Sequence, residues 1–101
     1  MNSKLKKRLR TIGHKLKAIV TIANNGLSDN VLAELNRALE DHELIKVKIL
    51  GSRNHRTKLI EVLNAIENTE VIQVVGAIAL VYRPSRQPNL SLSNIARAES
   101  L

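Results

Sequence analysis

The spacing of apolar and polar residues changes several times along this chain, and these changes predict alternating helices and strands. Three segments, beginning near residues 3, 28 and 52, carry apolar residues at helical spacing. Four short apolar runs have the composition of strands, at residues 18–22, 44–49, 70–75 and 77–82. The sequence therefore predicts the order α-β-α-β-α-β-β, an α/β (α+β) fold. In this fold, three helices pack on a four-stranded mixed sheet, and the last two strands form a tight hairpin around Gly76.

Several helix ends can be placed from single residues. Ser3 is the expected N-cap of the first helix, and Gly13 indicates that this helix ends near Thr11. Ser28 is the expected N-cap of the second helix, which runs through an acidic segment. Cations follow the start of the third helix at Ser52, where they oppose the helix dipole. Their position therefore gives weak support to the hypothesis that these cations have a role other than helix stability.

The first two strands differ in their patterns. Residues 18–22 lack alternation, which predicts a central strand buried on both faces. Residues 44–49 alternate, so Lys46 and Lys48 point away from the apolar face of their strand. Two lysines on one strand face suit an anion, and they equally suit a face or an edge that charge keeps soluble. The sequence leaves these two interpretations open.

A tight loop, residues 23–28, joins the first strand to the second helix. Asn25 and Gly26 suit positive φ better than most residues do. A loop that points backbone N–H groups and a helix N-terminus at one place can hold a phosphate. Ordinary turn chemistry requires the same residue types, so the loop alone favours a plain turn.

Charge is unevenly distributed along the 101 residues. Sixteen Lys and Arg against nine Asp and Glu give a net charge of +7. Every charged residue before Asp29 is basic, whereas the segment from Asp29 to Glu43 has five acids and one arginine. Small basic domains usually have an anionic partner, most often nucleic acid. The segregation of charge predicts one anion-binding face and another face that is turned away from the anion.

Other functional classes have no support in the sequence. There is no cysteine, which excludes disulfides and thiolate chemistry. The three histidines lie in separate segments, without a carboxylate at metal or catalytic spacing, so we expect no enzyme, metal or other cofactor. Apolar runs are about five to seven residues at most, and we expect a cytoplasmic protein with no membrane or small-molecule partner. Tyr82 is the only aromatic residue that could stack on a base, and it is equally placed to be a core residue.

Several of these segments together resemble the YhbY family, whose members are stand-alone CRM (chloroplast RNA splicing and ribosome maturation) domains. The resemblance spans residues of roughly 5 to 84 and includes Asn25–Ser28, His42–Lys48 and Leu80–Pro84. It implies a fold similar to the C-terminal domain of the bacterial third initiation factor, which agrees with the predicted order. It also implies RNA binding. Bacterial stand-alone members associate with precursors of the large ribosomal subunit, and plant relatives assist group II intron splicing.

The loop of this family is similar to the G-x-x-G loop of KH domains and contacts the RNA backbone. Here the loop is Ala23-Asn24-Asn25-Gly26, so alanine replaces the first glycine. Alanine penalises positive φ and prevents the closest approach of another backbone. Either this position does not need positive φ, or the contact with RNA through this loop is weaker.

The resulting hypothesis is one RNA-binding domain over residues 1–84, followed by a polar tail, residues 85–101, that is flexible or forms a short helix. The domain would bind ribosomal RNA in large-subunit precursors and assist ribosome assembly, mainly through phosphate contacts. The expected contacts come from the basic residues and the loop: Lys4, Lys7, Arg8, Lys15, Lys17, Asn24, Asn25, Gly26, Ser28, Lys46 and Lys48. The alternative is a protein-interaction module that docks through its acidic helix or its tail, and a duplex-DNA binder is a weaker third hypothesis.

Overall fold

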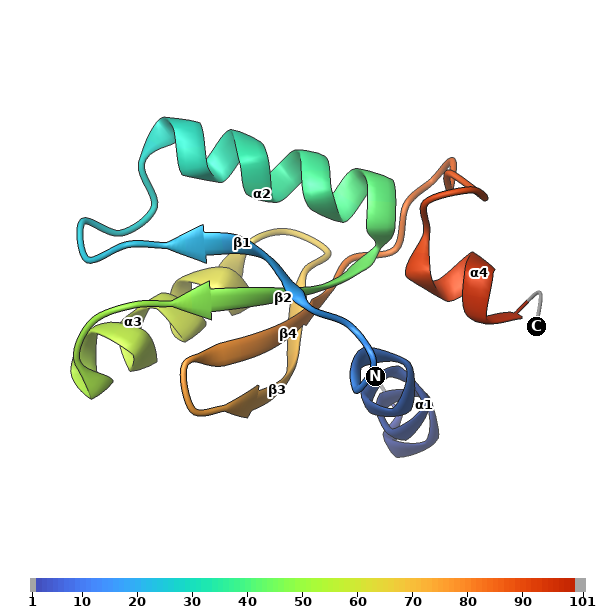
Figure 1. The fold of residues 1–101 in the computed structure, drawn as a ribbon, viewed down its shortest axis with the longest axis horizontal. Coiled ribbons are helices and arrows are strands. Elements are labelled where there is room, and N and C mark those ends of the chain that lie inside the picture. Colours follow the sequence, from blue (N-terminus) through green and yellow to red (C-terminus); the bar gives the residue numbers. More distant parts are fainter. Residues whose placement is uncertain (1, 100–101) are drawn as a thin grey trace.

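Four strands form one mixed sheet in a computed structural model that describes residues 2–99. The strands are β1 (Ala18–Ile22), β2 (Leu44–Ile49), β3 (Glu70–Val75) and β4 (Ile78–Tyr82). They lie in the order β1-β2-β4-β3, with β1 parallel to β2 and β4 antiparallel to both of its neighbours. Figure 1 shows this sheet with helices on both faces. The predicted fold class is confirmed.

Four helices pack on the sheet: α1 (Ser3–Gly13), α2 (Asp29–His42), α3 (Arg53–Ala65) and α4 (Asn94–Glu99). The main core lies between one sheet face and the apolar stripes of α2 and α3, and it contains fully buried residues such as Leu35, Leu63 and Val47. A smaller cluster on the opposite face joins Leu9 of α1 to β2, β3 and β4. Within residues 2–99, no helix is long and apolar enough to cross a membrane.

The prediction of a central β1 is wrong, because β1 is an edge strand of the sheet. Its burial alternates, with Val20 and Ile22 in the core and Thr21 exposed. Ile19 is 49% exposed, and a β-bulge lies between Ala18 and Val20. A bulge adds one unpaired residue to a strand and shifts the alternation of buried and exposed side chains by one position. Apolar residues can therefore follow one another in this strand although only one of its faces is buried.

The ends of α1 also differ from the prediction. Asn2, rather than Ser3, is the N-cap, and its Oδ1 accepts the N–H of Leu5 at 2.8 Å. The helix continues to Gly13, beyond the predicted end at Thr11. The glycine in the last turn therefore does not end this helix, and it serves instead to let the helix pack closely on Leu80 of β4.

The cations at the start of α3 have a structural role. The Arg56 guanidinium donates to the carbonyl oxygen of Gly51 at 2.9 Å. The ring Nδ1 of His55 lies 2.9 Å from the carbonyl oxygen of Leu50. Both contacts fix the loop that precedes the helix, so two of these basic residues are explained without a ligand.

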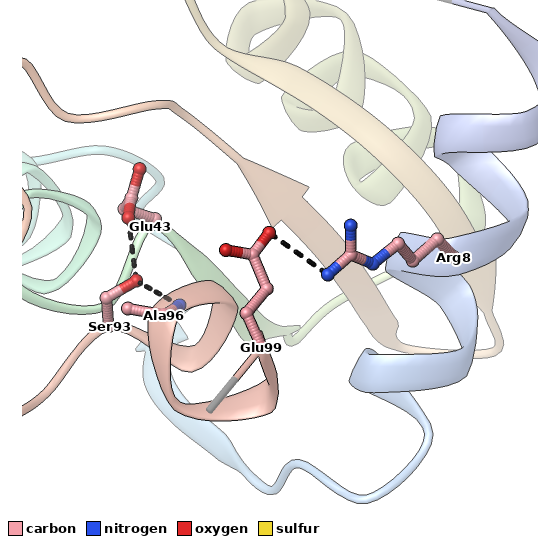
Figure 2. Close-up of polar contacts among 5 residues, drawn as sticks. All are labelled: Arg8, Glu43, Ser93, Ala96 and Glu99. Carbon is pink, nitrogen blue, oxygen red and sulfur yellow. Dashed lines mark hydrogen bonds and ion pairs between the residues drawn. The ribbon is translucent and has the colours of Figure 1, made fainter. Parts of the chain in front are cut away.

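The segment after Pro84 returns to the domain and ends in α4. Ser93 is fully buried, and its hydroxyl donates to Oε1 of Glu43 at 2.6 Å. The same Ser93 oxygen accepts the N–H of Ala96, which caps the start of α4 (Figure 2). Oε2 of Glu43 accepts the N–H of Ser85 at 2.9 Å. Glu43 lies at the C-cap of α2 with a positive φ of 62°, and it anchors the segment at two places.

Candidate nucleic-acid interface

The sheet face that packs on α1 is covered over only part of its length. Cross-strand pairing arranges its side chains in rows. Three rows follow one another along the sheet, Glu70–Tyr82–Leu44, then Gln73–Leu80–Lys46–Ala18, and then Val75–Ile78–Lys48–Thr21. The first row contributes Leu44 and Tyr82 to the cluster under α1 and α4. The third row lies open, and its Val75 is 66% exposed.

A groove follows the boundary between α1 and this open part of the sheet. It consists of two adjoining hollows, of about 470 Å³ over the sheet and about 560 Å³ along α1. His14 and Gln73 line both hollows and therefore join them. The floor over the sheet is apolar, with Ile78 and Leu80 among its residues.

The walls of the groove are basic. Lys7, Arg10 and Lys15 of α1 and the adjoining turn line the hollow along the helix, and Lys46 of β2 lines the hollow over the sheet. No Asp or Glu is among the residues that line either hollow. Lys48 lies two residues beyond Lys46 on the same strand face and is exposed. The groove therefore combines positive walls with an apolar floor, which suits an anion that also has an apolar part.

The predicted basic residues divide into three groups. Lys7, Lys15 and Lys46 meet at the groove, and Lys4 is exposed one helical turn before Lys7. Arg8 instead pairs with Glu99 of α4 at 3.0 Å (Figure 2). Lys17 is exposed and lines a separate hollow at the β1 edge with Ile19 and His42.

The loop after β1 lies at the far end of the sheet from α1 (Figure 1). Gly26 has the predicted positive φ, 81°, and its N–H donates to the carbonyl oxygen of Ala23 at 3.0 Å. Asn24 and Asn25 are exposed in the turn, and Ser28 caps α2 by accepting the N–H of Val31. The second predicted contact region is thus formed locally, but the structure places it apart from α1.

The alanine at the first position of the loop does not strain the backbone. Among the described residues other than glycine, only Glu43 and Asn68 have positive φ. Ala23 therefore adopts an ordinary conformation, and this position of the loop does not need positive φ. The methyl group still limits how closely another backbone can approach.

Four polar residues of the groove are absent from the predicted contacts: Arg10, Thr11, His14 and Gln73. A signal for two of them exists in the sequence, because Lys7, Arg10 and His14 follow at helical spacing on one side of α1. Gln73 gives only the weak signal of one polar residue in an apolar strand. Its place beside Leu80 follows from the pairing of β3 with β4, which the sequence does not reveal.

Other candidate chemistry is not supported by the structure. Tyr82 is partly buried against the smaller apolar cluster. Burial, and to a smaller extent the charges of Glu43 and Glu99, raise the pKa of its hydroxyl. Its ring is thus a packing residue rather than an open platform for bases. Over residues 2–99, no group of three or more His, Asp or Glu side chains could hold a metal ion.

The fold and the groove define a small basic α/β domain that has, on one sheet face, a groove lined by no acidic residue. Residues 1–83 match the CRS1 / YhbY (CRM) domain, and the chain belongs to this family. A Pseudomonas aeruginosa relative named as a probable RNA-binding protein is 50% identical over 93 residues, which are 91% of this chain and 89% of that protein. An RNA-binding protein of Haemophilus influenzae is 38% identical, over 91% of this chain and 94% of its own length.

A solved structure of the same fold supports this assignment. The solution structure of a hypothetical protein from Staphylococcus aureus, described as a candidate RNA-binding protein, superimposes with a TM-score of 0.74 at 30% identity. The match covers 92% of this chain and 97% of that chain.

Proposed function

We propose that this protein binds RNA, and that its target is ribosomal RNA in precursors of the large ribosomal subunit, where it assists assembly in the cytoplasm. The family, the names of its relatives and the net charge of +7 support RNA as the partner. The resemblance of the sequence to ribosome-associated members of the family supports the ribosomal target. The protein acts as a binding protein, without chemistry of its own.

The observation that carries this proposal is the groove beside α1, whose lining contains basic but no acidic residues. The basic side chains attract phosphates to such a surface, and no carboxylate in the lining repels them. Lys7, Arg10 and Lys15 would meet the strand along the helix, and Lys46 and Lys48 would continue the contact across the sheet. The acidic outer face of α2 lies on the opposite side of the sheet and would face away.

The loop Ala23–Ser28 would give a second contact with the RNA backbone. It lies at the C-terminal end of β1, a strand of five residues that spans about 16 Å. The two contact regions are therefore separated by the length of the sheet, and Lys48 lies in the row between them. A bound strand would follow the open face from α1 toward the loop and the N-terminus of α2.

A charge-reversal experiment tests the RNA-binding face. The triple variant Lys7→Glu, Arg10→Glu and Lys46→Glu should lose most of its affinity for single-stranded RNA. A matched control, Arg37→Glu, Lys58→Glu and Arg86→Glu, changes the net charge equally at exposed positions outside the groove and should retain most of it. In a log–log plot of affinity against salt concentration, the slope should be less steep by about two in the first variant. Each phosphate that is no longer neutralised contributes about 0.7 to this difference in slope. Equal reductions of affinity in both variants would contradict this assignment of the face.

Gradient sedimentation of cell extracts tests the ribosomal target. In low salt the protein should migrate with particles that contain large-subunit RNA, and the groove variant should remain at the top of the gradient. The control variant should migrate as the native protein does. If the native protein stays clear of every ribosomal particle, the role in assembly is wrong, even if RNA binding in solution is retained.

The alternative, a protein-interaction module, has less support. Its most accessible candidate is the tail, but Ser85, Ser93 and Glu99 use their polar groups to hold the segment on the domain. The charge-reversal pair separates the two hypotheses, because a partner that docks on the acidic helix would be insensitive to the groove variant.

A further inference from the structure

The hollow over the sheet is more than a place for phosphates, because most of its floor is apolar. Leu16, Ala18, Ile78 and Leu80 line it together with Val75 at the open end. A phosphate gains nothing from such a floor. A volume of about 470 Å³ lies within the range of about 300–1,000 Å³ for pockets that hold small molecules.

The polar groups around this floor are the kinds that recognise an unpaired base. His14 lines both hollows, and an imidazole is one of the side chains on which RNA bases stack. Gln73 also lines both hollows, and its amide offers donors and an acceptor to a base edge. Lys46 lines this hollow and Lys7 lines the adjoining one, so both can meet phosphates of the same strand.

We propose that this hollow accepts an unstacked base of single-stranded RNA, with the base against His14 and the apolar floor, and its edge toward Gln73. The inference rests on the proposed function and deepens it, since it makes unpaired RNA the preferred substrate. Charge complementarity selects RNA over a peptide strand as the occupant, because the lining has several cations and no acid. It also goes beyond the expectation that the protein binds RNA mainly through phosphate contacts.

Two substitutions at His14 separate stacking from charge. Affinity for an unstructured oligo(U) or oligo(A) strand is measured by fluorescence anisotropy. His14→Ala should weaken binding about fivefold or more, in keeping with about 1–3 kcal/mol for each stacked base. The salt slope should stay unchanged, because the same number of phosphates is bound. His14→Phe should restore the affinity, because a phenyl ring also stacks.

Two further ligands and one comparison variant complete the test. An abasic strand of the same length should bind native protein and His14→Ala with equal affinity. A duplex should also bind these two proteins with equal affinity. Lys7→Ala should weaken binding to all three ligands and flatten the salt slope. His14 is exposed, so thermal unfolding of its variants should match that of the native protein.

The outcomes distinguish failure of this inference from failure of the proposed function. Salt-dependent binding of the oligonucleotide that is equal in native protein and His14→Ala would overturn the base site and leave RNA binding intact. An equal weakening on the abasic strand would overturn it as well. Failure of native protein to bind any RNA would overturn the proposed function itself.

Discussion

Gly13 lies directly against Leu80, and this contact sets how close α1 comes to the sheet. A Cβ at position 13 would lie 2.6 Å from both terminal carbons of Leu80. Leu80 is only 2% exposed, and its two terminal carbons would have to shift to admit a methyl group at position 13. The absence of a side chain at position 13 therefore lets α1 pack close to the sheet, and the next residue, His14, lines the groove.

We expect Gly13→Ala to destabilise the fold by about 1–3 kcal/mol, because an added methyl group in a packed contact displaces its neighbours. A better helix former at this position would offset part of this cost. Urea unfolding measures the effect. The double variant Gly13→Ala with Leu80→Val should be less destabilised than the sum of the single variants, since the shorter side chain relieves the contact. Additive effects would show that the clash is not the cause.

Periodicity is sufficient to predict most elements of this fold, because helices and strands bury stripes that the chain displays locally. Val31, Leu35 and Leu39 mark α2 in this way, and its N-cap at Ser28 is confirmed. Features that depend on distant packing could not be predicted. Gly13 resembles a helix stop because the sequence does not show Leu80 beside it.

The candidate site likewise combines features that a local pattern predicts with features that depend on distant packing. The alternation of β2 predicts that Lys46 points away from the core, which is confirmed by its partial exposure on the open face. The partners that make it part of a groove, Gln73 and His14, come from other elements. They join Lys46 only through the pairing of β2 and β3 with β4 and the packing of α1, which no local pattern encodes. Likewise, Glu43 belongs to an acidic segment in the sequence, but its buried carboxylate holds the segment after Pro84.

The contact of Ser93 with Glu43 gives a prediction about the C-terminal segment. Ser93→Ala removes one hydrogen bond from a buried carboxylate and removes the cap of α4. We expect a destabilisation of about 1–3 kcal/mol. Hydrogen exchange should be faster at the amides of Ala96 and Arg97, which bond to Ser93. Ser91→Ala is the matched control, because Ser91 is exposed in the same segment. Equal exchange in both variants would mean that other contacts hold α4.

The first position of the loop gives a prediction that separates stability from affinity. Ala23→Gly should lower the free energy of unfolding by about 0.5–1 kcal/mol, because glycine increases the entropy of the unfolded chain and Ala23 is not strained. RNA affinity, measured by anisotropy, should be unchanged or higher, since the backbone becomes more accessible. Gly26→Ala should behave differently, with a stability cost of about 1–2 kcal/mol from positive φ. A clear loss of affinity in Ala23→Gly would contradict RNA backbone contact through this loop.

Tyr82 gives a pH-dependent stability with a definite sign. Burial raises the pKa of its hydroxyl above the ordinary value of 10.0, with smaller contributions from Glu43 and Glu99. Since the folded state favours the neutral phenol, this contribution is fully present below pH 10.0 and is lost as the pH rises through the folded-state pKa. Tyr82→Phe should lose less stability in alkaline solution than the native protein, as measured by urea unfolding on both sides of that pH. Parallel pH curves would show that Tyr82 ionises equally in both states.

The ion pair between Arg8 and Glu99 gives a prediction that depends on RNA. Both side chains are about half exposed, at 51% and 55%, so the pair contributes little to stability, and Glu99→Gln should unfold at nearly the same denaturant concentration. The substitution leaves at most a neutral hydrogen bond in place of the ion pair, which loosens Arg8, and it removes a negative charge beside the basic helix α1 (Figure 2). RNA affinity should therefore rise by about two- to fivefold, with a steeper salt slope as Arg8 gains a phosphate. Glu34→Gln, an equal charge change on the exposed face of α2, is the control and should raise affinity less. If the two variants bind alike, Arg8 does not take part in binding, and the contact surface of α1 is confined to the side that faces the groove.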